Sequence, residues 1–269
     1  MSLCDRFKRE ITYLRVSVTD KCNLRCTYCM PTDGVPLCAH EEILTFEEIV
    51  AVVKVAVKWG ITKVRLTGGE PLVRTDIVKL VAMVGAIPGI LDYAMTTNGI
   101  LLADYALELK NAGLHRVNIS LDSIEDDRYQ EITRGGNLAK VLEGIKAAKD
   151  TGLGPVKINT VQGRNAAEPV DVEKVKEFCD KHSLEHRVIN KMNLQEGIFS
   201  IVEGGTGGDC LKCNRLRLSA QGVLYPCLFS DIGYRVRKLG IQQALDLAVK
   251  NKPASGTVNN NGRFYQMGG

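Results

Sequence analysis

The stretch LRVSVTDKCNLRCTYCMP, from Leu14 to Pro31, joins a strand-like run to three closely spaced cysteines. Its first part alternates apolar and polar residues, which is the pattern of a β-strand with one buried face. Its second part places Cys22, Cys26 and Cys29 within eight residues. A structural zinc site is normally closed by four ligands, so a group of three needs an explanation.

A second group of three cysteines lies near the C-terminus, in the stretch CLKCNRLRLSAQGVLYPC. It comprises Cys210, Cys213 and Cys227. Cys38 or His40 could complete the first group as a zinc site, but the second group has no evident fourth ligand. A four-iron cluster has four iron corners, each of which needs a ligand. Three cysteines would hold three corners and leave one iron open to a small molecule.

The composition sets limits on the class of protein. A chain of 269 residues that is 45% hydrophobic can form one large domain, or a domain with a small appendage. The net charge of +4 gives no indication of nucleic-acid binding. No apolar run has the length of a membrane span, and the N-terminus lacks a secretory apolar core. We therefore expect a cytoplasmic protein with no nucleic-acid or membrane partner, whose nine cysteines serve metal binding or catalysis rather than disulfides.

Most of the chain alternates strand-like and helix-like stretches. Strands are expected at 13–18, 62–67, 92–96, 115–121, 156–161 and 185–190. Helices are expected near 45–58, 75–86, 101–112, 137–150 and 169–182. Six β/α repeats predict parallel strands with right-handed crossovers, and no Walker or GxGxxG loop follows a strand. We therefore predict an α/β fold: a partial (β/α)6 TIM-like barrel with a small C-terminal iron–sulfur extension.

One face of each predicted strand is polar. Between residues 62 and 67, for example, Arg65 and Thr67 alternate with Val64 and Leu66. A parallel strand that is buried on both faces should be apolar on both. We therefore expect the polar faces to line a lumen that holds ligand or water. The alternative is an antiparallel sheet with one wet face, which the intervening helices disfavour.

Three regions follow from this pattern. Residues 1–190 are expected to form the barrel, and 191–209 a glycine-rich connector. Residues 210–269 are expected to form the extension, which carries the second cysteine group and ends in Gly268-Gly269.

The motifs resemble those of a known superfamily. The spacing Cys22-x3-Cys26-x2-Cys29, with Tyr28 before the last cysteine, resembles the signature of radical S-adenosylmethionine enzymes. TGGEP, from Thr67 to Pro71, resembles their loop for the methionine amino group. The second cysteine group, the phrase CNRLRL and the Gly-Gly end resemble the GTP 3′,8-cyclases, which catalyse the first step of molybdenum-cofactor (molybdopterin) biosynthesis. The likeness covers nearly the whole chain except about 191–209.

This resemblance implies two [4Fe-4S] clusters and S-adenosylmethionine as cofactors. The metal ligands would be Cys22, Cys26, Cys29, Cys210, Cys213 and Cys227. The cofactor contacts would be Tyr28, Gly68, Gly69, Glu70, Ser120 and Met192. The open iron of the first cluster would chelate S-adenosylmethionine, whose cleavage yields a 5′-deoxyadenosyl radical; the protein orients this chemistry and excludes water.

The resemblance also implies GTP as the substrate, which the radical converts to 3′,8-cyclo-7,8-dihydro-GTP. The substrate contacts would be Arg15, Arg65, Thr96, Lys157, Arg215, Arg217 and the backbone of Leu216. Arg15, Gly268 and Gly269 would be catalytic. If 213–219 is extended, Cys213, Arg215 and Arg217 share one face, where planar guanidinium groups suit phosphate oxygens. The implied partners are a reducing electron donor and a downstream pterin-forming enzyme, and a homodimer is compatible with the resemblance.

Two features depart from the family pattern. The connector 191–209 is shorter than the family's corresponding stretch, and Asn190-Lys191 replaces an acidic-aromatic pair before Met192. A related radical enzyme acting on another nucleotide or on a peptide is therefore an alternative. A non-catalytic scaffold that uses the six cysteines structurally is a second alternative, from a different class of protein.

Overall fold

The computed structural model describes residues 3–192 and 200–257, which form one mixed sheet flanked by helices. The strands are β1 (Tyr13–Ser17), β2 (Lys63–Thr67), β3 (Asp92–Thr97), β4 (Arg116–Ser120), β5 (Lys157–Gln162), β6 (Glu185–Asn190), β7 (Arg215–Leu218), β8 (Val223–Tyr225) and β9 (Tyr234–Arg235). They lie in the order β6-β5-β4-β3-β2-β1-β7-β8-β9. Neighbours from β6 to β7 are parallel, whereas β7–β8 and β8–β9 are antiparallel.

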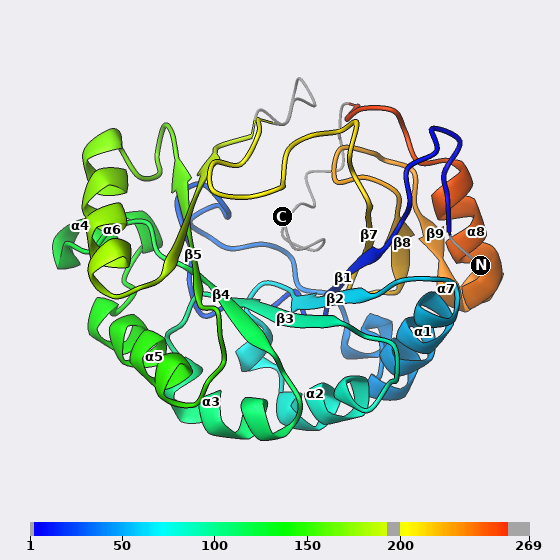
Figure 1. The fold of residues 1–269 in the computed structure, drawn as a ribbon, viewed down its shortest axis with the longest axis horizontal. Coiled ribbons are helices and arrows are strands. Elements are labelled where there is room, and N and C mark those ends of the chain that lie inside the picture. The colour runs from blue at the N-terminus through cyan, green and yellow to red at the C-terminus, as the bar shows by residue number, and fades with distance from the viewer. Residues whose placement is uncertain (1–2, 193–199, 258–269) are drawn as a thin grey trace.

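The helices cover the convex side of this sheet (Figure 1). They are α1 (Phe46–Lys58), α2 (Ile77–Gly85), α3 (Leu102–Asn111), α4 (Asp126–Thr133), α5 (Leu138–Asp150), α6 (Pro169–Lys181), α7 (Val236–Leu239) and α8 (Ile241–Lys250), with short 3-10 turns at His40–Glu42 and Pro71–Val73. Each of the strands β1 to β5 leads through a helical crossover to the next parallel strand, so the predicted partial TIM-like barrel of six parallel strands is confirmed. The sheet does not close into a complete barrel.

The hydrophobic core lies between the sheet and these helices. Leu14 and Val16 of β1 are fully buried and belong to the same cluster as Ile49 of α1. Helix α1 begins where the sequence predicts, because Glu48 N donates to Thr45 Oγ1 (3.2 Å) and Thr45 N donates to Glu48 Oε2 (2.8 Å). The apolar faces of the strands thus contact the helices, which leaves their polar faces on the concave side.

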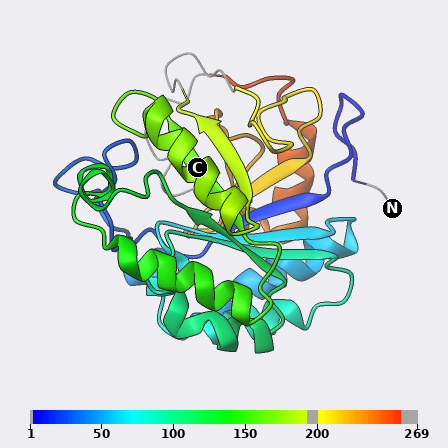
Figure 2. The ribbon, with the colours of Figure 1, turned by 60° about the vertical axis from the view of Figure 1, so that its left-hand side comes forward.

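The segment predicted as a C-terminal extension continues the sheet of the barrel. Its first strand, β7, pairs in parallel with β1, so the second cysteine group lies beside the strand that leads to the first. Helix α8 packs against α1, and Figure 2 shows this end of the sheet from another side. Part of the connector joins the opposite edge, where Glu203 forms an antiparallel bridge with Val188 of β6.

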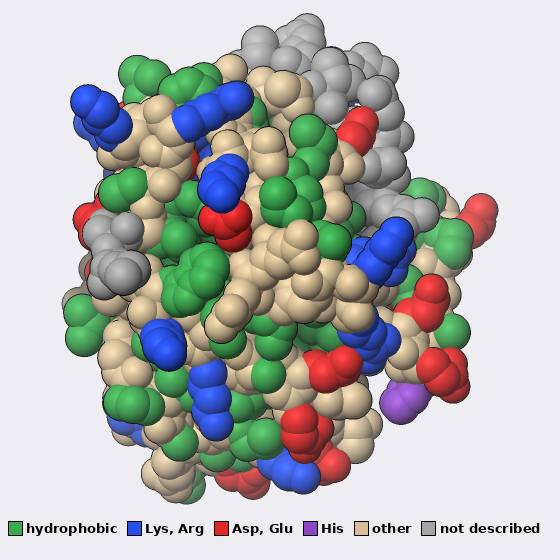
Figure 3. Space-filling model, turned by 90° about the vertical axis from the view of Figure 1, so that its right-hand side faces the viewer, with side chains coloured by type: hydrophobic (Ala, Val, Ile, Leu, Met, Phe, Trp, Pro, Cys, Tyr) green, Lys and Arg blue, Asp and Glu red, His purple; other side chains and the backbone are tan. Residues whose placement is uncertain are grey.

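Helix α4 was not expected from the sequence. Its residues, DDRYQEIT, are mostly polar, so the apolar periodicity that predicts a helix is weak. Tyr129 and Ile132 nevertheless bury its inner side. None of the helices in the described residues is both long and apolar enough to cross a membrane. On the face of the molecule near β9 and α8, hydrophobic and charged side chains are interspersed (Figure 3).

Candidate active site in the half-barrel

The first cysteine group lies in the loop that follows β1. The loop turns tightly between two of its cysteines, because Cys29 N donates to Cys26 O (2.9 Å). It is also fixed to the end of α4, since Thr27 N donates to Ile132 O (2.9 Å). Burial raises the pKa of the Cys22, Cys26 and Cys29 thiols, that of Cys29 to about 11. A metal bound here would therefore displace protons from the thiols.

The number of thiols in this loop suits an iron–sulfur cluster with one open corner. In the part of the chain that the structure describes, no three His, Cys, Asp or Glu side chains lie close enough together to hold one metal ion. A zinc ion needs thiolate sulfurs about 2.3 Å from one centre, whereas a four-iron cluster binds its cysteines at separate corners. Two groups of three cysteines agree in number with two clusters that each keep one open corner.

Tyr28 is held by the ends of two other strands. Its hydroxyl donates to Asp122 Oδ2 (2.7 Å), and Val161 N of β5 donates to Asp122 Oδ1 (2.8 Å). Burial raises the pKa of Asp122 to about 6. Asp122 therefore positions the predicted cofactor residue Tyr28, a role that no local sequence signal assigned to it. Ser120, another predicted cofactor residue, ends β4 two residues earlier and is half-buried.

The glycines after β2 allow two loops to pack backbone against backbone. A Cβ at Gly68 would lie 2.6 Å from Thr19 O, and one at Gly69 would lie 2.4 Å from Lys21 O. Gly69 N also donates to Thr19 O (2.9 Å). The resemblance implies that both glycines contact the cofactor, a role that stays a prediction. The structure shows that they allow close approach of the loop that carries Cys22.

Glu70, the third predicted cofactor residue of this loop, ties β2 to β3. Its Oε1 accepts from Thr97 Oγ1 (2.8 Å) and from Leu72 N (3.0 Å), and its Oε2 accepts from Asn98 N (2.6 Å). Burial raises the pKa of this carboxyl group to about 7. The contacts of Glu70 thus fix the loop geometry beside the first cysteine group.

Replacing Gly69 with alanine is expected to loosen the first cysteine loop. The new methyl group would meet a backbone oxygen at 2.4 Å, which must move because it belongs to no flexible side chain. Overpacking of this kind costs about 1–3 kcal/mol of unfolding free energy. Iron analysis and thermal unfolding should show less bound iron and a lower midpoint. Gly154→Ala is the matched control, since its Cβ would have no neighbour nearer than 3.8 Å. Equal iron content in the two variants would contradict the packing argument.

The lumen carries three arginines side by side. In the register of the sheet, Arg15 of β1 lies opposite Arg65 of β2 on one side and opposite Arg217 of β7 on the other. Neighbouring strands are about 4.8 Å apart, so like charges directly opposite one another destabilise the sheet. Burial, followed by the neighbouring Arg215, lowers the pKa of Arg217 only to about 10, so this group remains charged at neutral pH.

A second row of side chains, from Lys63, Tyr13 and Arg215, lies beside the arginine row. Tyr13 of β1 is opposite Lys63 of β2 and Arg215 of β7. The ring of Tyr13 lies 5.1 Å from Lys63 Nζ and 5.6 Å from the Arg215 guanidinium carbon, within cation–π range. Tyr13 thus separates two cations with an aromatic face. Sequence analysis missed Tyr13, although it shares the alternating face of Arg15.

Several buried polar atoms in the lumen have no hydrogen-bond partner among the described residues. They are the hydroxyl groups of Tyr13 and Thr96, the Nδ2 of Asn118, and the Nε atoms of Arg65, Arg187 and Arg215. Buried polar groups are nearly always hydrogen-bonded in folded proteins. Their concentration on one cationic surface therefore fits a polyanionic ligand with many acceptor oxygens.

The remaining predicted substrate residues have different surroundings. Lys157 of β5 forms an ion pair with Glu185 of β6, so part of its charge is already matched. The side chain of Leu216 is fully buried on the opposite, core face, and only its backbone could serve the predicted role. Met192 packs against Leu228 and Phe229, the same small cluster that Cys227 contacts. Gly268 and Gly269 lie outside the described residues.

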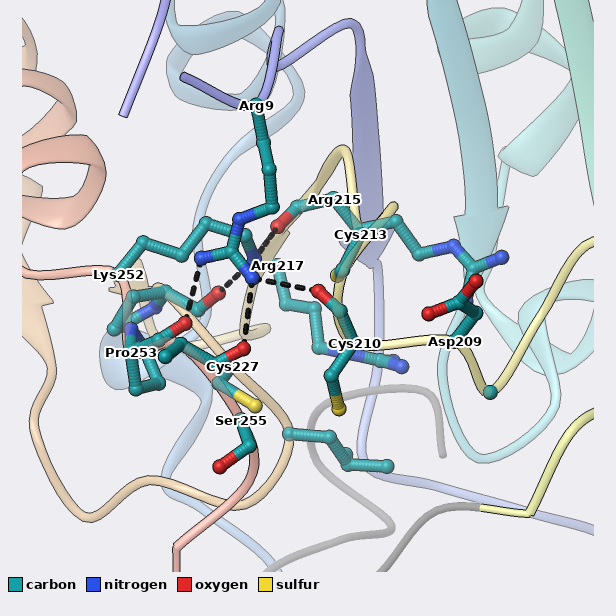
Figure 4. A pocket seen from close by; sticks show the side chains of 14 residues that line it. Arg9, Asp209, Cys210, Cys213, Arg215, Arg217, Cys227, Lys252, Pro253 and Ser255 are labelled. Carbon is teal, nitrogen blue, oxygen red and sulfur yellow. Dashed lines mark hydrogen bonds between the residues drawn. The ribbon is translucent and has the colours of Figure 1, made fainter. Parts of the chain in front are cut away.

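The second cysteine group surrounds a pocket next to these arginines (Figure 4). Cys210, Cys213 and Cys227 line it together with Arg215 and Arg217. Cys213 N donates to Cys210 O (3.3 Å), which forms the turn of the Cys-x2-Cys motif. The alternation predicted for 213–219 agrees with the burial of Leu216 and Leu218 in the core. The two cysteine groups therefore lie at the ends of one cationic lumen.

Comparison with known proteins identifies the class. The model of the radical SAM superfamily matches residues 16–178. Among solved structures, SuiB of Streptococcus suis bound to S-adenosylmethionine superposes with a TM-score of 0.68 at 13% identity, over 91% of this chain and 66% of that one. The structure titled native anSMEcpe with bound AdoMet gives 0.64 at 17% identity, over 90% and 81%. These likenesses establish the fold, and the family match shows that the chain is a radical S-adenosylmethionine protein.

The curated relatives narrow this class. A GTP 3′,8-cyclase of Listeria welshimeri is 39% identical over 93% of this chain and 91% of its own. That of Alkaliphilus oremlandii is 42% identical over 93% and 92%, and that of Petrotoga mobilis 39% identical over 97% of each. The chain belongs to the GTP 3′,8-cyclase family.

The same alignments show that this chain is shorter than its relatives. The match to the Listeria protein extends over 302 aligned positions, which exceeds the 269 residues of the whole chain. The relative therefore contains residues that have no counterpart here. This length difference is consistent with the shortened connector expected at 191–209.

Proposed function

We propose that this protein cyclises GTP to 3′,8-cyclo-7,8-dihydro-GTP, using S-adenosylmethionine and two [4Fe-4S] clusters. The observation that carries the proposal is the row of Arg65, Arg15 and Arg217 between the two cysteine groups. A triphosphate brings the concentrated negative charge that such a row requires. Family membership, established above, supplies the reaction and places it in molybdenum-cofactor biosynthesis.

The first cluster and its cofactor would be held by the loops at the ends of β1, β2 and β4. Cys22, Cys26 and Cys29 supply three ligands, while Asp122 fixes the orientation of Tyr28. When bound, the cluster and S-adenosylmethionine supply the one-electron chemistry that removes a hydrogen atom from the substrate. The packing of Gly68 and Gly69 against the cysteine loop keeps these loops in a constant relative position.

The arginine row would bind the triphosphate and position the ribose. Guanidinium groups donate two parallel hydrogen bonds to phosphate oxygens, and burial strengthens them. Arg15 lies at the centre of the row, where it would contact the substrate between Arg65 and Arg217. Thr96 of β3 and Lys157 of β5 remain proposed contacts. Cys210, Cys213 and Cys227 would hold the second cluster, whose open iron would face the guanine end.

Other parts of the proposal rest on the family alone. A reducing electron donor and a downstream pterin-forming enzyme would complete the pathway. A catalytic role of Gly268 and Gly269, which lie outside the described residues, also remains a proposal. A related enzyme acting on another nucleotide or a peptide is the second candidate, and the reduced length of the chain is the observation that favours it.

One incubation distinguishes these candidates. Anaerobically reconstituted protein is mixed with GTP, S-adenosylmethionine and dithionite, and the products are separated by liquid chromatography and mass spectrometry. We expect 5′-deoxyadenosine and the cyclised nucleotide in equal amounts. Formation of 5′-deoxyadenosine without any GTP-derived product would contradict GTP as the substrate and would support a radical enzyme that acts on another substrate. Absence of both products from iron-loaded protein would contradict the enzyme itself. Omission of GTP provides the control for uncoupled cleavage.

A further inference from the structure

Lys252 is a buried lysine next to the second cysteine group. Its exposed fraction is 1%, and it follows the end of α8. Its Nζ donates to Arg215 O (2.7 Å) and to Pro226 O (2.7 Å). Among the described residues, no carboxylate forms an ion pair with it. A buried ammonium group without a carboxylate is costly unless another negative group balances it.

Arg9 binds the segment that carries Cys210, the remaining cysteine of the second group. Its Nη1 donates to Cys210 O (2.7 Å), and its Nη2 donates to Pro253 O (2.6 Å). Its Nε pairs with Asp5 Oδ2 at 2.6 Å, so the charge of Arg9 is already balanced. Arg9 therefore joins the N-terminal segment, the Cys210 loop and the residue that follows Lys252.

Together the two cations reach every ligand segment of the second group. Arg9 binds the backbone of Cys210 itself. Lys252 binds the carbonyls of Arg215, two residues after Cys213, and of Pro226, directly before Cys227. Figure 4 shows both side chains beside the three cysteines. Arg9 lies 201 positions from Cys210 in the sequence and Lys252 lies 26 positions from Pro226, so the two cations tie these segments to other parts of the chain without any metal.

We propose that Arg9 and Lys252 form a clamp that preorganises the second iron–sulfur site, and that Lys252 supplies the positive charge that balances the bound cluster. The inference rests on the two-cluster part of the proposed function. Arg9 acts through position alone, because Asp5 neutralises it. Lys252 acts through both position and charge, because its buried Nζ binds the carbonyls beside Cys213 and Cys227 and lines the same pocket as the three cysteines.

The charge of Lys252 has a consequence for electron transfer. Hydrogen bonds to cluster sulfurs and nearby positive charge favour the reduced state, which carries one more negative charge. Removal of the charge therefore shifts the reduction potential of the second cluster to a more negative value. A tenfold change in the one-electron equilibrium corresponds to about 59 mV, and we expect a shift of this order.

The test measures the second cluster alone. Full-length protein with Cys22, Cys26 and Cys29 replaced by alanine retains only this site, and its potential is followed by electron paramagnetic resonance during a redox titration. In this background, Lys252→Met removes charge and hydrogen bonds, whereas Lys252→Gln keeps a donor without charge. Lys250→Met is the matched control, because Lys250 ends the same helix but is exposed and pairs with Asp246.

Both Lys252 variants should show the negative shift, and Lys252→Met should also lose iron to a chelator about tenfold faster than the control. Arg9→Met should lose iron faster without a change in potential. If Lys252→Met does not fold, the Gln variant still reports the effect of charge. Potentials and iron-loss rates equal to those of Lys250→Met would overturn the clamp while leaving the proposed function intact. Wild-type protein with only four irons would overturn both the clamp and the two-cluster part of the proposed function. Protein that shows the shift in potential but does not cyclise GTP would overturn only the assignment of GTP as the substrate.

Discussion

Replacing Cys22, Cys26 and Cys29 together with alanine is expected to remove about half of the bound iron and to abolish cleavage of S-adenosylmethionine. The reason is that, in the proposed function, these three residues hold one cluster, whereas the second cysteine group lies in a different loop. Iron and sulfide analysis with an assay for 5′-deoxyadenosine measures both effects. The loss of activity should be complete, because no other group in the proposed site can reduce the sulfonium.

The complementary variant should behave differently. Replacing Cys210, Cys213 and Cys227 removes the other half of the iron, but some uncoupled cleavage of S-adenosylmethionine should remain because the first site is intact. Cys4→Ala is the control, since Cys4 is exposed and belongs to neither group. Stoichiometric zinc with negligible iron after anaerobic preparation would contradict the iron–sulfur enzyme and support a structural metal-binding scaffold instead.

Local pattern predicted the barrel because each of its repeats is encoded within a short stretch. The alternation of Arg65 and Thr67 with Val64 and Leu66 predicts one polar and one apolar face, and Val64 and Leu66 are fully buried. The capping box of Thr45 predicts the start of α1. The pairing of β7 with β1 could not be predicted in this way, because it joins residues about two hundred positions apart and has no local signal.

The candidate site shows the same division. The cysteine spacing and the arginine alternation are local patterns, so the sequence analysis found these residues. Arg9 and Lys252 are single charged residues in stretches without periodicity, and only the fold brings them to the second cysteine group. Asp122 was likewise visible only as a polar residue after a strand, and its hydrogen bond to Tyr28 joins residues 94 positions apart.

Arg217→Ala is expected to weaken GTP binding without loss of either cluster. Arg217 is 5% exposed and lies opposite Arg15, so solvent does not screen its interaction with a phosphate. A charge-assisted hydrogen bond typically contributes about 1.5–3 kcal/mol, which corresponds to roughly tenfold to over a hundredfold in affinity. Arg215→Ala should also weaken GTP binding. Either substitution relieves repulsion between like charges, so it should raise the melting temperature of the protein without GTP. The two readouts therefore move in opposite directions, as expected for a residue retained for binding rather than for stability.

Lysine at position 217 should restore only part of the affinity, because an ammonium group cannot donate the paired hydrogen bonds of a guanidinium group. Arg235→Ala provides the control, since Arg235 lies exposed on β9. Titration calorimetry with GTP and iron analysis on the same samples separate binding from cluster loss. Unchanged GTP affinity in both Arg215→Ala and Arg217→Ala would show that the arginine row does not bind the triphosphate. The Nε atoms of Arg65 and Arg215, which have no hydrogen-bond partner in the described part of the chain, would then need a different anion, and the assignment of GTP to this lumen would lose its main physical support.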